Sequence, residues 1–241
     1  MILDLAGTRW PASEQRVTKV QVFSRIRAAL LVAGCAAVMV GCASSVAPQV
    51  KRLPERVELS GTFYRGEANQ SGPQVLASLL SQQGIVITPG LLEKPLRLPG
   101  AEDKLQQNIQ NLAREYGMVV YPLDKNLPAL LTQVAAGFPV MVRFSEGSAF
   151  WAEPRYAILS GYDRNKQKVL LRAGMNRREL MSFSAFESAF EKSGGWAILI
   201  QKPAQLPADV DRQRWLKAAD ELSQAGQEPE AAQARKALAA H

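Results

Sequence analysis

The sequence predicts an α+β fold, with helices first and a mostly antiparallel sheet after them, because the period of its apolar residues changes along the chain. Between residues 72 and 137, apolar residues recur every three or four positions, as in helices on a core. Between residues 139 and 201, short apolar runs rich in β-branched and aromatic residues alternate with turn signals. Residues 207–241 return to a helical pattern. We therefore expect a helical part plus an antiparallel sheet, followed by a C-terminal helical hairpin.

The helical part has start and stop signals of its own. Pro73 lies in the first turn of the first helix, and Gly84 lies just past its end, which is the usual asymmetry of these two residues. Thr88 and Pro89 open a short second helix. The third helix stops at Gly117. The four helices are predicted to begin at Gly72, Thr88, Leu105 and Asn126.

The sheet is predicted from five short apolar runs. Residues 163–166, of sequence Asp-Arg-Asn-Lys, form a hairpin turn between two of them. A further helix, Ser184–Lys192, interrupts the series. The predicted strands are Pro139–Phe144, Tyr156–Tyr162, Lys168–Arg172, Arg178–Met181 and Trp196–Gln201.

Residues 207–241 form two amphipathic stretches around a turn at 226–229. Trp215, Leu222 and Leu238 mark the apolar faces of the two helices. The segment resembles a single tetratricopeptide-type repeat in length and layout. One such unit does not bury its own apolar face, so it docks either on the main domain or on a partner.

The first 41 residues read as an export signal. A basic stretch ends at Arg27, residues 28–41 are apolar or small, and Cys42 follows Gly41. This resembles a bacterial lipoprotein signal, which implies that Cys42 is acylated and anchors the chain to the membrane. Ala43, rather than aspartate, after that cysteine implies the outer membrane, facing the periplasm.

Three alternatives for the leader stay open. Cys35 also follows a lipobox-like sequence, although the apolar core before it is then short. A transmembrane anchor requires about 20 apolar residues, more than this stretch contains. Translation could also start later, near Val17. After the signal, residues 42–56 are expected to be a tether, 57–206 the main domain and 207–241 the hairpin.

Composition limits the function classes. Five of the 29 basic and two of the 22 acidic residues lie in 1–42, which leaves 24 and 20 scattered along the rest. A nucleic-acid binder would show a clustered basic face, so this class is not expected. The one histidine is His241, and both cysteines lie in the leader. We expect no disulfide framework, no metal site and no cofactor.

The order of several motifs resembles the C39-type, papain-like cysteine peptidases. Residues 61–77 resemble the segment in which Cys-Gly-Pro opens a helix, and residues 155–163 resemble the strand that starts with the catalytic histidine. Residues 98–100, 136–140, 171–174 and 195–197 fit in the same order. The resemblance covers roughly residues 57–241. Over this range the sequence is similar to envelope C39-like proteins that have a C-terminal tetratricopeptide-type tail.

The departures from this family fall on its chemistry. The resemblance places the nucleophile at Ser71, the histidine at Arg155 and the oxyanion-hole glutamine at Gly66. The third catalytic member would fall near Arg172 or Ala173, where there is no carboxylate. Gln70 lies too close to Ser71 to replace the missing glutamine. We interpret Ser71 as an N-cap or turn residue.

Arginine stays protonated and is no base for a serine hydroxyl. We therefore expect an inactive peptidase-like domain that binds a peptide or protein partner in the envelope, in secretion or export, through Arg155, Ser71, Gln70 and Arg172. The alternative is a hydrolase that pairs Ser71 with a lysine, which would be Lys166, Lys168 or Lys192. A structural lipoprotein acting through the hairpin overlaps the first hypothesis.

Overall fold

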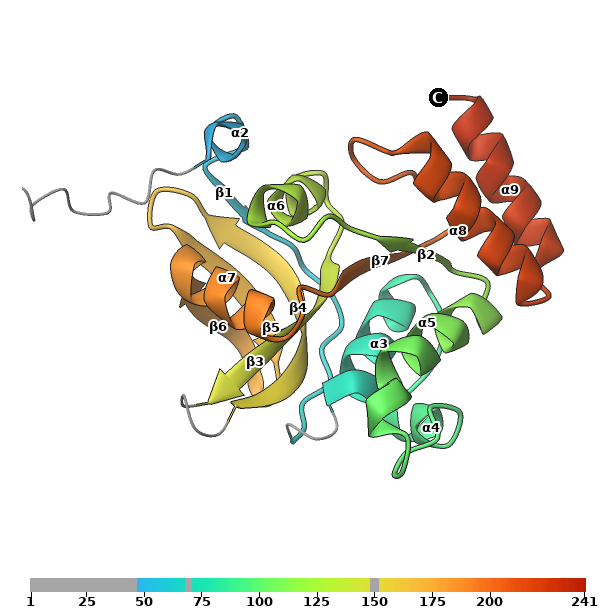
Figure 1. Cartoon of the computed structure of the whole chain (residues 1–241), viewed down its shortest axis with the longest axis horizontal. Coiled ribbons are helices and arrows are strands. Elements are labelled where there is room, and N and C mark those ends of the chain that lie inside the picture. The colour runs from blue at the N-terminus through green and yellow to red at the C-terminus, as the bar shows by residue number, and fades with distance from the viewer. Residues whose placement is uncertain (1–46, 68–70, 148–151) are drawn as a thin grey trace, which may run out of the picture. The chain divides into compact units, whose positions relative to one another are not determined.

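The computed structural model describes residues 47–67, 71–147 and 152–241. These residues form an α+β domain around one twisted sheet, with helices on both faces (Figure 1). The predicted fold class is confirmed, and every strand pairing in the described part is antiparallel. The leader with Cys35 and Cys42, and the first residues of the expected tether, lie outside the described residues.

The sheet has seven strands in the described part of the chain, in the order β2-β7-β3-β4-β5-β6, with β1 beside β4. The central strand β4 is the longest, and its register is set by the pairs Val140 with Leu159 and Leu159 with Leu171. The strands are β1 (Arg56–Glu58), β2 (Val119–Pro122), β3 (Val140–Gly147), β4 (Ala152–Asp163), β5 (Lys168–Ala173), β6 (Asn176–Ser182) and β7 (Ala197–Gln201).

Helices α3, α4 and α5 cover one face of the sheet. They are α3 (Ser71–Gln82), α4 (Pro89–Glu93) and α5 (Leu105–Glu115), the last preceded by the short 3-10 helix η3 (Glu102–Lys104). Leu76, Leu80 and Ile109 are fully buried and pack with Tyr156 and Ile158 of β4 in one apolar cluster. Alternate residues of β4 therefore belong to this face, as the period of two in a strand requires.

Helices α6 and α7 cover the other face. They are α6 (Leu127–Ala135) and α7 (Phe183–Lys192). Asn126 caps α6 by accepting the N–H of Ala129 at 2.9 Å, and Ser182 caps α7 by accepting the N–H of Ala185 at 3.2 Å. Phe186 and Phe144 are fully buried in the apolar cluster of this face.

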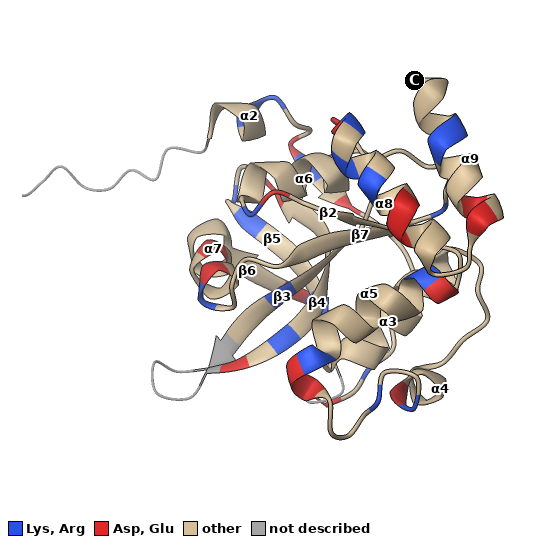
Figure 2. Cartoon of the chain, turned by 45° about the vertical axis from the view of Figure 1, so that its right-hand side comes forward, with Lys and Arg blue, Asp and Glu red and all other residues tan. Residues whose placement is uncertain are grey.

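The C-terminal hairpin packs on its own domain, which decides between the two alternatives left open above. Its helices are α8 (Arg212–Gln224) and α9 (Glu228–Ala239). Trp215 of α8 is fully buried, lies 6.1 Å from the Tyr121 ring and joins the cluster of the α6 and α7 face. Its Nε1 donates to the carbonyl of Ala234 at 2.8 Å, which holds α9 against α8. In α8 the basic residues come before the acidic ones, and in α9 the order is reversed (Figure 2).

The folded part begins earlier than expected. Residues 47–56 were predicted to be tether, but they contain the short helix α2 (Pro48–Lys51) and the first residue of β1. Val50 is 2% exposed and packs into the core beside α6. The backbone N–H of Arg164 donates to Glu55 at 2.9 Å. Ala47 and Leu53 also pack against this core, but three apolar residues among polar ones and two prolines are too few to establish a period. Strand β2 was not predicted either.

Candidate functional site

Ser71, the residue at the expected nucleophile position, is tied to the sheet. It is the first residue of α3, is 4% exposed, and its Oγ accepts the backbone N–H of Tyr156 at 3.1 Å. The predicted N-cap role is therefore replaced by a tertiary one: the hydroxyl joins the start of α3 to β4, 85 residues further along the chain. The oxygen therefore already accepts one hydrogen bond and lies away from solvent.

Gly66, at the expected oxyanion-hole position, faces the side chain of Gln74. A Cβ placed on Gly66 would lie 1.7 Å from Nε2 and 2.6 Å from Cδ of Gln74. The carboxamide of Gln74 therefore occupies the space that a side chain at position 66 would need. Gln74 is 4% exposed, and its Oε1 has no hydrogen-bond partner among the described residues. Sequence reasoning missed Gln74, because only the folded chain brings it to Gly66.

Arg155, at the expected histidine position, lies next to this cluster. It precedes Tyr156 in β4, and a Cβ placed on Gly174 would lie 3.8 Å from its Nη1. The backbone N–H of Gly66 donates to the carbonyl of Gly174 at 3.3 Å. The structure thus brings Gly66, Ser71 and Arg155 into one neighbourhood around the start of α3. We call Gly66, Ser71, Gln74, Arg155 and Gly174 the α3 cluster.

The phenol of Tyr156, whose backbone N–H binds Ser71, is not a base at neutral pH. Tyr156 is buried with its ring edge-on to Trp196, at a centroid distance of 5.7 Å. Burial raises the pKa of the Tyr156 phenol to about 12, although the positive charge of Arg143 acts in the opposite direction. The phenol therefore stays protonated. Arg143 itself is held by Ser193, whose Oγ donates to its carbonyl at 2.6 Å.

The lysines proposed as a base lie elsewhere. Lys168 pairs with Asp163 at the far end of β4, seven residues from Tyr156, which corresponds to roughly 23 Å along the strand. Lys166 lies in the adjoining turn and its side chain is 72% exposed. As predicted, Asp163 serves that turn, since its Oδ1 accepts the N–H of Lys166 at 2.9 Å. Lys192 is exposed at the end of α7. The structure gives the serine–lysine hypothesis no support.

Arg172, the fourth expected binding residue, belongs to a different place. It is 5% exposed, and its Nη2 donates to the carbonyl of Leu59. It lines a cavity of about 280 Å³ beside β1 and β6, and that cavity shares no lining residue with the α3 cluster. Gln70, the remaining expected binding residue, lies outside the described residues.

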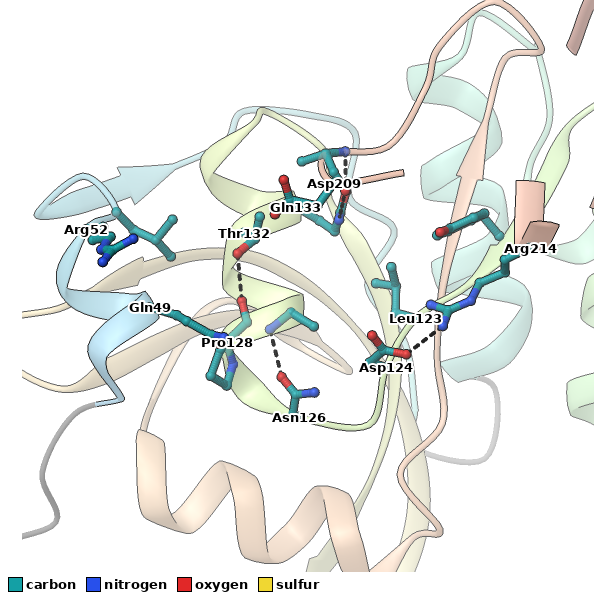
Figure 3. A pocket seen from close by; sticks show the side chains of 14 residues that line it. Gln49, Arg52, Leu123, Asp124, Asn126, Pro128, Thr132, Gln133, Asp209 and Arg214 are labelled. Carbon is teal, nitrogen blue, oxygen red and sulfur yellow. Dashed lines mark hydrogen bonds and ion pairs between the residues drawn. The ribbon is translucent and has the colours of Figure 1, made fainter. Parts of the chain in front are cut away.

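A hollow of about 420 Å³ lies between α2, α6 and the segment that leads into α8 (Figure 3). Its polar groups bind one another. The Gln133 carboxamide exchanges two hydrogen bonds with the backbone of Ala208, at 2.8 and 2.9 Å, and Arg214 pairs with Asp124 at 2.7 Å. Asn126 caps α6. These side chains fasten the hairpin to the domain and leave no buried polar group there in need of a ligand.

The described residues contain neither a cluster that could bind a metal ion nor a helix that could span a membrane. No group of three or more His, Cys, Asp or Glu side chains is placed to hold a metal ion in the part of the chain that the structure describes. Within the same residues, no helix has both the length and the apolar character needed to cross a membrane.

Comparison with known proteins gives structural similarity only. No protein-family model matches the chain, and no curated protein matches it. A solved structure described as a C39-like peptidase from Bacillus anthracis is 16% identical, with a TM-score of 0.47, over 62% of this chain and 98% of that one. The peptidase domain of Streptococcus ComA, a bifunctional ABC transporter of a quorum-sensing pathway, is 17% identical, with a TM-score of 0.45, over 62% of this chain and 100% of that domain. The chain is therefore structurally similar to two C39-like peptidase domains.

Proposed function

We propose that the chain is a catalytically inactive, C39-like domain that binds a peptide or protein segment at the bacterial cell envelope, in secretion or export. The observation that carries the proposal is the environment of Ser71. Its hydroxyl is buried and accepts a backbone N–H, and the residue at the histidine position is Arg155. A serine attacks only when a neighbouring base takes its proton, and a guanidinium carries one already.

The α3 cluster supports the same conclusion from a second side. Oxyanion stabilisation requires donors aimed at the position where negative charge develops. Gly66 has no side chain to supply such a donor, and the space beside it holds the carboxamide of Gln74. The chain's one histidine, His241, lies at the exposed C-terminus. The motifs that place these residues together are kept, which favours a binding role for the fold.

The envelope location rests on the leader alone. We propose acylation of Cys42, after cleavage of residues 1–41, and anchorage to the outer membrane on the periplasmic side. Mass spectrometry of the mature N-terminus tests this. Loss of the acylated species in Cys42→Ala, but not in Cys35→Ala, is expected, and the reverse result assigns the anchor to Cys35.

Two measurements test the proposal at Ser71. The full chain, incubated with casein, with a double-glycine peptide and with a serine-reactive fluorophosphonate, is expected to show no turnover and no labelling. An acyl or phosphonyl adduct at Ser71 that disappears in Ser71→Ala would contradict inactivity.

Binding is tested with three forms of the protein in a pull-down from an envelope extract. Loss of captured protein in Arg155→Ala, but not in the exposed control Arg52→Ala, is expected for recognition beside the α3 cluster. If a chain truncated at Pro207 loses capture while Arg155→Ala retains it, the C-terminal hairpin is the binding element, and the proposal for the cluster is wrong.

A further inference from the structure

The cavity beside β1 and β6 combines a buried positive charge with an open volume. It measures about 280 Å³, and its lining includes Leu59, Leu170, Arg172, Glu58, Arg177 and Arg178. Its lining therefore holds three arginines and one carboxylate, a net charge of +2. None of its lining residues belongs to the α3 cluster, so an inference drawn here does not depend on the inactivity of Ser71.

Arg172 is the unusual residue of this cavity. Only 5% of its surface is exposed, and one amino group of its guanidinium, Nη2, donates to the carbonyl of Leu59. The other, Nη1, is buried and has no hydrogen-bond partner among the described residues. A buried charge with an unmet donor is costly, and most such groups in folded proteins are satisfied by a partner, water or ligand.

The other charges do not neutralise Arg172. Glu58, the acidic residue of the lining, is taken up by Arg178, whose Nε and Nη2 donate to its two oxygens at 2.9 and 3.1 Å. Burial, followed by the positive charge of Arg177, lowers the pKa of Arg172 below its ordinary value, although the negative charge of Glu58 acts in the opposite direction. The guanidinium still remains charged at neutral pH. The cavity thus presents Arg172 and Arg177 without a carboxylate of their own among its lining residues.

The remaining walls define what accompanies the negative charge. Leu59 and Leu170 supply an apolar side next to the guanidinium. β6, which carries Arg177 and Arg178, is the last strand in the sheet order and pairs only with β5 among the described strands. An edge strand offers main-chain donors and acceptors to an extended peptide. The volume is below the range of drug-sized sites and matches a group of about one residue.

From these features we infer that the cavity binds the carboxylate of a peptide that ends in a small apolar residue, with Arg172 and Arg177 holding the carboxylate and the two leucines contacting the terminal side chain. Guanidinium groups hold a carboxylate through charge-assisted hydrogen bonds, which Arg177 and the part of Arg172 that lines the cavity can supply. The inference goes beyond the proposed function, since it assigns a second site and the chemistry of its ligand.

Calorimetric titration of the full chain with N-acetyl-alanyl-alanine tests the inference. The free acid is expected to bind, and the same dipeptide with an amidated C-terminus is expected not to. Inorganic phosphate serves as a third probe and is expected to bind more weakly than the acid, because it gains nothing from the leucine wall. Equal binding of acid and amide, no binding of the acid, or tighter binding of phosphate would each overturn the inference.

Variants then assign the binding to this cavity. Arg172→Gln is expected to weaken the acid at least about tenfold, since a charged hydrogen-bond partner is lost. Arg177→Gln, at an exposed position, is expected to weaken binding of the free acid several-fold. If Arg172→Gln fails to fold, this variant alone tests whether the acid binds in the cavity. Arg52→Gln removes the same charge elsewhere on the surface and is expected to leave binding unchanged. An equal loss in Arg52→Gln and Arg177→Gln would show a non-specific charge effect and overturn the assignment.

Discussion

The contact between Gly66 and Gln74 predicts that even one methyl group at position 66 destabilises the protein. In Gly66→Ala the new Cβ would lie 1.7 Å from Nε2 and 2.6 Å from Cδ of Gln74. Non-bonded atoms of these types rest at about 3.5–4.0 Å, so the carboxamide must move. Gln74 is 4% exposed, so its flexible side chain has little open space into which the carboxamide can turn.

Overpacking of this kind costs about 1–3 kcal/mol of unfolding free energy. For a folded unit of this size the melting temperature falls by roughly 2–4 °C per kcal/mol, so Gly66→Ala is expected to melt about 2–12 °C lower than the parent chain. The loss of glycine flexibility in the unfolded chain opposes this by less than about 1 kcal/mol. Differential scanning calorimetry measures the shift, and urea unfolding measures the free energy.

Gly90→Ala is the matched control, because a Cβ placed on Gly90 meets nothing within 4 Å and the residue lies in α4. It is expected to be neutral or slightly stabilising. The double variant Gly66→Ala with Gln74→Ala removes the clashing group and is expected to be more stable than the two single effects added together. If Gly66→Ala melts like the control, or if the double variant shows no coupling, the close approach is not real and the argument from it for an empty oxyanion position is wrong.

Three further predictions follow from other close contacts. Gly161→Ala is expected to lower the unfolding free energy by about 3 kcal/mol or more, which is a larger loss than for Gly66→Ala. The reason is that its Cβ would lie 2.4 Å from the backbone carbonyl oxygen of Val57, and a backbone atom cannot move away by changing rotamer. Urea unfolding measures both losses, and a smaller loss for Gly161→Ala than for Gly66→Ala refutes the prediction. Trp215→Phe is expected to lower the unfolding free energy by about 1–3 kcal/mol, because the hydrogen bond from the buried indole N–H to the Ala234 carbonyl is lost. The backbone amides of α8 and α9 are then expected to exchange hydrogen faster, and unchanged exchange contradicts the prediction. Hydrogen bonds from Arg178, and then from Arg56, lower the pKa of Glu58 to about 2, so its carboxylate stabilises the fold above pH 4.5 and loses that contribution as pH falls towards 2. The difference in unfolding free energy between the parent chain and Glu58→Gln is below about 1 kcal/mol for so exposed a pair, and it is expected to vanish between pH 4.5 and 2. A difference that does not change with pH counts against the ion pair.

Much of the fold could be predicted from the sequence because its signals are local. The helices that begin near Gly72, Pro89 and Asn126 carry a proline or a capping side chain at their N-terminal end, as predicted. Strands β3, β5 and β7 carry apolar runs. Strand β1 escaped prediction because three residues show no period, and it is held by its pairing with β4 instead. Strand β2 lies in an apolar run of the same kind, residues 118–121, from which it could have been predicted.

For the candidate site too, some features follow from the sequence and others only from the folded structure. The sequence by itself determined that the chain has no histidine before its last residue and no cysteine after Cys42, and that arginine stands at the histidine position implied by the resemblance. These facts are independent of folding. Only the tertiary structure decided that the Ser71 hydroxyl is used by Tyr156 and that the Gln74 carboxamide fills the space beside Gly66. It also moved Arg172 from the expected groove to a cavity of its own. Such contacts join residues through hydrogen bonds and packing between separate elements, and the spacing of residues along a chain does not encode which side chains meet there.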